Sequence, residues 1–111
     1  MNQYVRDITE AALDDELLQS NQPILVDLWA PWCGPFRATS PGVEAAAEKL
    51  AGSAKGYKIN VDDNPSASPR FNVRGIPTLI LFEDGREKNR LAGLSSLQQI
   101  EALVTPGLLA K

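Results

Sequence analysis

The chain holds one cysteine, Cys33, and no histidine, and these two counts limit the chemistry that its side chains can perform. Without histidine, Ser-His-Asp and Cys-His nucleophiles are excluded, together with most zinc sites. With one cysteine, no disulfide can form within the chain and no cysteine cluster can hold a metal ion. We therefore expect neither a metal nor another cofactor, and we expect thiol chemistry at Cys33.

The position of Cys33 favours a reactive thiol. An apolar run, ILVDLW (24–29), is typical of a strand buried on both faces, and good helix formers follow as far as about Leu50. Gly34 and Pro35 suit the entry to that helix, so Cys33 falls at its N-terminus. Free N–H groups and the helix dipole there favour a thiolate, and can lower a cysteine pKa from about 8.5 into roughly the 3.5–7.5 range. A cysteine that merely fills the core is the alternative.

The segments around Cys33 alternate between strand and helix patterns, an order typical of a single α/β domain. Extended or apolar runs predict strands at 4–7, 24–29, 57–61, 78–82 and 86–92, the last two joined by an Asp84-Gly85 turn. Helical patterns follow Thr9, with Leu13, Leu17 and Leu18 on the apolar face, and Ser95, with Leu97, Ile100, Leu103 and Val104 on it. A kink or a late helix start is expected at Pro41, and a short helical piece is expected to end at Phe71. We expect residues 1–111 to form one domain, with 106–111 as a loose tail.

Composition and charge limit the partners and the cellular location that we expect for the protein. The chain is 43% hydrophobic, which is enough for an ordinary globular core. Its 11 basic and 14 acidic residues are mixed along the sequence, so no basic block is available for nucleic acid. No stretch resembles a signal peptide or approaches the ~20 apolar residues of a membrane span. We expect no nucleic-acid or membrane partner and a cytoplasmic location, export after removal of a signal being the alternative.

Several segments together resemble the thioredoxin family. WAPWCGPF (29–36) resembles the active-site segment of that family, which usually reads W-A-x-W-C-G-P-C. KINVD (58–62) resembles the third strand of the family, and GIPT (75–78) resembles the loop that carries its cis-proline. Asp84-Gly85 and Gly93 also lie where the family has glycines. The resemblance covers roughly residues 8–104 and implies a thioredoxin fold, an α/β domain whose central mixed β-sheet is flanked by helices on both faces.

Phe36 stands where the resemblance places the second active-site cysteine. That cysteine lies one helical turn after the first and expels the substrate from the mixed disulfide. Phenylalanine cannot do this, so the resemblance implies a thiol-disulfide oxidoreductase restricted to monothiol chemistry. Cys33 would attack protein disulfides, and the adduct would persist until another thiol released it. The substitution is either natural or an alteration of a working thioredoxin, and the sequence leaves both readings open.

Asp27 and Lys58 are the residues that the resemblance adds to Cys33 as catalytic groups. Asp27 is out of place in a buried apolar run, and in the family this carboxylate exchanges protons with the second cysteine. Burial should raise its pKa, while the ammonium of Lys58 should lower it. A retained structural ion pair or hydrogen bond is the alternative. In the functional interpretation, Asp27 influences Cys33 through the local electric field.

The resemblance also implies a surface for an extended substrate segment. A cis Pro77 would place the backbone of Ile76 opposite Cys33, where it could pair with substrate as an added strand. A proline that merely opens the strand 78–82 is the alternative. The residues expected to bind substrate are Trp32, Gly34, Pro35, Phe36, Gly75, Ile76, Pro77 and Gly93.

Two functions follow as competing hypotheses. The first is the monothiol oxidoreductase, with protein disulfides as substrates and glutathione or a thioredoxin-reductase-like protein as reductant. This hypothesis expects a monomer, with a Cys33-linked dimer on oxidation. The second is a redox-impaired protein-binding or chaperone-like module, favoured by the apolar area that Phe36 would add beside the cysteine.

Overall fold

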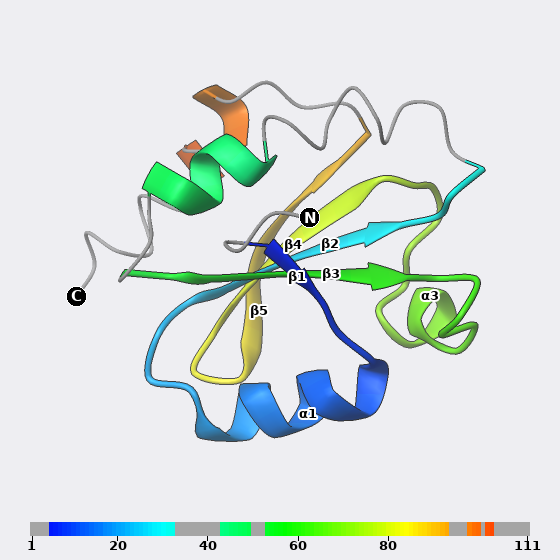
Figure 1. Cartoon of the computed structure of the whole chain (residues 1–111), viewed down its shortest axis with the longest axis horizontal. Coiled ribbons are helices and arrows are strands. Elements are labelled where there is room, and N and C mark those ends of the chain that lie inside the picture. The colour runs from blue at the N-terminus through cyan, green and yellow to red at the C-terminus, as the bar shows by residue number, and fades with distance from the viewer. Residues whose placement is uncertain (1–4, 33–42, 50–52, 94–97, 101, 104–111) are drawn as a thin grey trace.

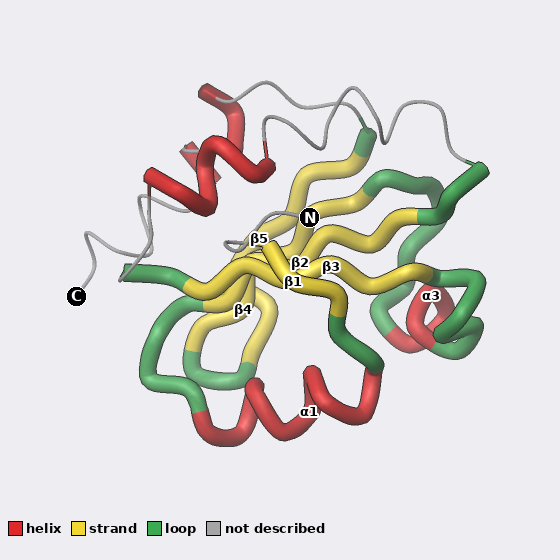
Figure 2. The backbone as a smooth tube through the Cα atoms, viewed as in Figure 1, coloured by secondary structure: helices red, strands yellow, loops and turns green. Residues whose placement is uncertain are grey.

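The computed structural model of the protein describes residues 5–32, 43–49, 53–93, 98–100 and 102–103. The described strands are β1 (Val5–Asp7), β2 (Ile24–Trp29), β3 (Lys55–Asn60), β4 (Thr78–Glu83) and β5 (Arg86–Ala92). They form one five-stranded sheet in the order β1-β3-β2-β4-β5. The strands of this sheet are drawn in yellow in Figure 2. Strands β1, β3 and β2 run parallel, whereas β4 is antiparallel to β2 and β5 is antiparallel to β4. The sheet is therefore mixed, as expected.

Helices cover both faces of this sheet (Figure 1). The helices α1 (Glu10–Gln19) and α3 (Ala67–Arg70) pack on one face through Leu13 and Ala67. Helical residues 43–49 and 98–103, of which 101 lies outside the description, contribute Val43 and Ile100 to a second apolar cluster on the other face. Because β2 and β4 lie in the middle of the sheet, their side chains are buried on both faces.

Local signals in the sequence place the ends of α1 and of the hairpin. Thr9 caps α1, because its side-chain oxygen accepts a hydrogen bond of 3.1 Å from the backbone N–H of Ala12. Asp84 and Gly85 both have positive φ, 56° and 79°, which is the backbone of a tight two-residue hairpin turn. Both predictions are confirmed.

The expected apolar face of α1 is wrong at one position. Leu13 is fully buried, but Leu18 is 85% exposed. Five residues of helix rotate Leu18 about 140° away from Leu13, so the two cannot share a narrow face.

The predicted start of strand β3 is also wrong. This strand begins at Lys55 rather than at Tyr57, because Lys55 and Gly56 pair in register with Ile24 and Leu25.

Candidate functional site

Asp27 is a buried carboxyl in the centre of the sheet. It is 1% exposed, and its Oδ1 accepts no hydrogen bond from the residues that the structure describes. Its register partner on β4 is Leu79, which offers no polar group. Burial raises the pKa of Asp27 from 3.8 to about 7, against the lowering influence of the Lys58 ammonium. Asp27 can therefore exchange a proton near neutral pH, and the two causes that act on its pKa, burial and the Lys58 ammonium, have the expected directions.

Lys58 is the register partner of Asp27 on the neighbouring strand β3. Its Nζ does not form an ion pair with Asp27 within the described residues, and it lies 5.6 Å from the centroid of the Trp29 ring. An ammonium over an aromatic face is attracted by the electrons of the ring. Lys58 therefore influences Asp27 through space while its charged end contacts Trp29, and the structural ion pair of the alternative interpretation is not formed between these two described residues.

Trp32 lies on the surface beyond the end of β2. Its side chain is 68% exposed, and its Nε1–H donates a hydrogen bond of 3.1 Å to Oδ1 of Asp62. The same residue, Trp32, lines a hollow of about 360 Å³. The residues that line the hollow are Trp32, Val61, Ser68, Val73, Arg74, Gly75 and Ile76.

The loop before β4 borders the same hollow, because Gly75 and Ile76 line it. The Ile76–Pro77 peptide bond is cis, as the resemblance implied. The Thr78 hydroxyl donates a hydrogen bond of 2.6 Å to the Gly75 carbonyl. The Gly93 N–H donates one of 2.8 Å to the carbonyl of Pro77, and Gly93 has a φ of 85° that favours glycine. The roles of these residues in substrate binding stay predictions.

The structure brings together part of the expected site. Trp32, Gly75 and Ile76 line one hollow, and Gly93 is bonded to Pro77 beside it. Cys33, Gly34, Pro35 and Phe36 lie outside the described residues, as do the expected helix start and the kink at Pro41.

Sequence reasoning missed several residues around these positions. Val73 and Arg74 extend the hollow towards α3, and Asp62 orients Trp32. It also missed a second hollow of about 440 Å³, to which Asp7, Trp29 and Asn60 contribute where β1, β2 and β3 end. The common position of these three residues at the ends of parallel strands could have indicated it.

The mixed sheet covered by helices on both faces, with a buried carboxyl in its central strand and a cis-proline loop at one end, defines a thioredoxin-fold protein. The family model for Thioredoxin matches residues 4–106, so the chain belongs to the thioredoxin family.

Three similar proteins agree with this assignment. The chain is 41% identical over 98 residues to thioredoxin of Porphyra purpurea, covering 88% of this chain and 92% of that one. It is 36% identical over 104 residues to thioredoxin of Pseudomonas aeruginosa, covering 94% and 96%. It is 44% identical over 89 residues to thioredoxin of Pyropia yezoensis, covering 80% and 83%. Membership in this family supports thiol-disulfide oxidoreductase chemistry.

Two further features concern ligands and membranes. Within the described part of the chain, no group of three or more acidic or cysteine side chains could hold a metal ion. None of the helices in that part has the length and apolar character needed to cross a bilayer.

Proposed function

We propose that this protein is a monothiol member of the thioredoxin family, in which Cys33 attacks disulfides of other proteins. The Cys33 thiolate forms a bond to one sulfur of the substrate disulfide, and the other sulfur leaves as a thiolate and takes up a proton. The product is a mixed disulfide between Cys33 and the substrate. The support is the single cysteine of the chain within a Trp-Cys-Gly-Pro segment that resembles the active site of the family.

A second thiol must complete the cycle, because the chain has no other cysteine. We propose glutathione or a reductase dithiol in this role. One glutathione thiolate attacks the mixed disulfide and releases the substrate thiol, and a second releases Cys33 as glutathione disulfide forms. The two electrons that reduce the substrate thus come from two glutathione molecules, and a reducing, cytoplasmic compartment would supply them.

The burial and raised pKa of Asp27 are the structural observation that carries the proposal. A carboxyl that is 1% exposed and has a pKa of about 7 can donate and accept a proton near neutral pH. Such a group can assist thiol-disulfide exchange, because thiols lose a proton to attack and regain it on release. Nothing in the apolar packing of β2 requires a carboxyl at this position, since its neighbour on β4 is Leu79.

Mass spectrometry after incubation with glutathione disulfide tests the proposal. We expect a one-to-one adduct that persists until free thiol is added, and no adduct with Cys33→Ser. An insulin-reduction assay should show turnover with glutathione as reductant. Rapid loss of the adduct without added thiol would contradict the monothiol mechanism.

Replacing Phe36 with cysteine tests the role of the missing thiol. A cysteine one helical turn after Cys33 would lie on the same helix face, within reach of a disulfide. We expect Phe36→Cys to reduce insulin at least tenfold faster with dithiothreitol than the unchanged protein does, whereas Phe36→Ser should not. A Phe36→Cys variant that forms the disulfide and remains inactive would favour the alternative function.

The alternative is a protein-binding module, and the exposed Trp32 favours it. An indole that is 68% exposed, and held by Asp62 beside an apolar hollow, is a common anchor for a partner protein. Under this alternative, Trp32→Ala would abolish partner binding while Cys33→Ser would leave it unchanged. Loss of binding in both variants would support covalent capture through Cys33.

A further inference from the structure

The guanidinium of Arg90 joins the edge strand β5 to the end of α3. Its Nη2–H donates a hydrogen bond of 2.7 Å to the carbonyl of Phe71, and its Nη1–H donates one of 3.3 Å to the carbonyl of Asn72. Phe71 is the C-terminal cap of α3, and a basic side chain at that end of a helix can bind the last carbonyls. Arg90 therefore holds the two peptide groups through which the chain leaves α3.

A bulge in β5 directs Arg90 and Glu87 to the same face of the sheet. In a regular strand, residues three apart point to opposite faces. Here Lys88 is an extra residue, because Glu87 is paired with Phe82 and Arg90 with Ile80 across a shift in register. Ile80 and Phe82 belong to one buried cluster, on the face that α1 and α3 cover. Glu87 and Arg90 therefore both point to that face.

Glu87 fixes the direction of the Arg90 guanidinium. Nε–H and Nη2–H of Arg90 each donate a hydrogen bond of 2.6 Å, one to each carboxylate oxygen of Glu87. A pair held by two parallel bonds fixes the orientation of the guanidinium as well as its position. The hydrogen bond from Arg90 also lowers the pKa of the Glu87 carboxyl, which is therefore ionised at neutral pH. Strand β5 thus presents an oriented donor to the end of α3.

The segment that Arg90 holds leads directly into the hollow beside Trp32. Asn72 has a φ of 54°, a left-handed conformation that asparagine adopts more readily than most residues. The N–H of Val73 then donates a hydrogen bond of 2.8 Å to the carbonyl of Ser68. Val73 and the three residues after it line the hollow together with Trp32. The carbonyls that Arg90 binds thus lie immediately before this lining loop.

We propose that Arg90 is a positioning residue for the thiol site, which holds the loop 73–76 in the conformation that lines the hollow. Cys33 follows Trp32 in the chain, so a protein substrate bound in this hollow would lie beside the thiol. The use of the hollow by a substrate rests on the proposed function, whereas the positioning of the loop does not.

Amide hydrogen exchange measured by NMR tests the positioning. In Arg90→Met the Val73 amide should exchange at least about fivefold faster, because the turn before it loses its hydrogen-bond donor and opens more often. The amide of Val26, in the central strand β2, reports global unfolding and should change little. Arg90 is 30% exposed on an edge strand, so the variant should fold.

Arg86→Met is the matched control, because it removes an equal charge from an exposed position of the same strand. It should leave the exchange of Val73 and Val26 unchanged. An unchanged Val73 amide in Arg90→Met would overturn the proposal. Equal acceleration of Val73 and Val26 would overturn it as well, since Arg90 would then stabilise the whole fold rather than the loop.

The reaction of Cys33 with insulin and with iodoacetamide connects the loop to the thiol site. Arg90→Met should slow the formation of a mixed disulfide with insulin at least about threefold, because the docking surface is less well ordered. Alkylation by iodoacetamide should be unchanged at every pH, since this small reagent does not need the hollow. An unchanged rate with insulin would overturn the positioning role of Arg90 at the thiol site.

Failure of the proposed function is distinguishable from failure of this proposal. If the unchanged protein forms no adduct with insulin, the proposed function is contradicted. The exchange of the Val73 amide still decides whether Arg90 holds the loop, because it requires neither a substrate nor a reactive thiol.

Discussion

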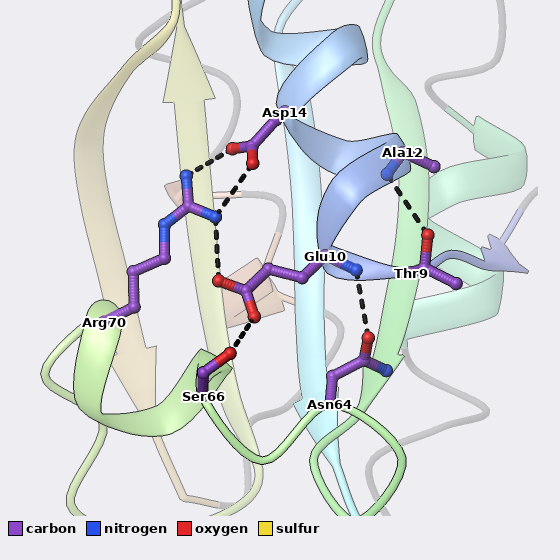
Figure 3. Close-up of polar contacts among 7 residues, drawn as sticks. All are labelled: Thr9, Glu10, Ala12, Asp14, Asn64, Ser66 and Arg70. Atoms are coloured by element: carbon purple, nitrogen blue, oxygen red, sulfur yellow. Dashed lines mark hydrogen bonds and ion pairs between the residues drawn. The ribbon is translucent and has the colours of Figure 1, made fainter.

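The carboxyl groups on the two faces of the sheet differ in their hydrogen-bond and ion-pair partners. On the face covered by α1 and α3, Glu10 and Asp14 both bind the Arg70 guanidinium (Figure 3). Glu10 also accepts a hydrogen bond of 2.5 Å from Ser66, and its backbone N–H donates one of 3.0 Å to Asn64. On the other face, Asp27 is buried and Oδ1 accepts no hydrogen bond from a described residue.

The pKa values follow this difference. Hydrogen bonds from Ser66 and Arg70 lower the pKa of Glu10, and the hydrogen bond from Arg70 lowers that of Asp14. Burial raises the pKa of Asp27 to about 7. The first pair of carboxyls joins α1 to α3 and contributes to stability, whereas the third destabilises the fold when ionised. A carboxyl that costs stability and is nevertheless present in a central strand is best explained by function.

The largest expected change in stability comes from Asp27→Asn. A raised pKa means that the folded protein binds the proton more tightly, so stability falls as pH rises from about 4 through about 7. Removing the charge should therefore increase the free energy of unfolding by about 2–4 kcal/mol at pH 8. Urea unfolding at two pH values measures this. A gain that is as large at pH 5 as at pH 8 would contradict the pKa assigned to Asp27.

Arg70→Met should have the opposite sign and a smaller size. We expect a loss of about 1–2 kcal/mol at pH 7, reduced by solvent screening because Arg70 and Asp14 are more than one-third exposed. The lowered pKa values of Glu10 and Asp14 mean that this contribution is present above about pH 4.5 and is lost as pH falls further. The difference in stability between the two proteins should therefore become smaller as pH falls below about 4. Arg74→Met, which removes an exposed arginine outside the network, is the control.

Glu16→Gln should give the smallest effect, about 1 kcal/mol of lost stability. Glu16 accepts hydrogen bonds of 2.7 Å from the Tyr57 hydroxyl and 3.0 Å from Lys55. Burial and this carboxylate together raise the pKa of Tyr57 to about 12. The variant should lower that pKa while leaving it above 10, since the burial remains. Tyrosinate absorbance in a Tyr4→Phe background measures it, and an unchanged titration would show that burial alone sets the value.

The sequence predicted the strands and the exceptional carboxyl because each has a local signal. Asp27 interrupts an apolar run, and no charge is expected in a strand buried on both faces. The Thr9 side chain caps a helix that begins at the next residue, and the Asp84-Gly85 pair forms a turn between two adjacent strands. Both signals therefore act over only a few residues. The cis peptide bond at Pro77 came from the family resemblance.

Features that depend on distant pairing could not be predicted in this way. The extension of β3 to Lys55 depends on pairing with β2, which overrides the weak strand propensity of Gly56. Asp7 becomes a neighbour of Lys58 through the β1–β3 register, and nothing in the short β1 segment indicates this. Leu18 was wrongly assigned to the buried face of α1. The angular position of each leucine around the helix predicts its burial better than the number of leucines in the segment does.

Titration of the Asp27 carboxyl carbon in the unchanged protein tests the contrast between the two faces most directly. We expect a midpoint near 7 for Asp27, and midpoints below their ordinary values for Glu10 and Asp14. An Asp27 midpoint near its ordinary value of 3.8 would contradict this difference between the faces, because the carboxyl would then be ionised at neutral pH like the other two.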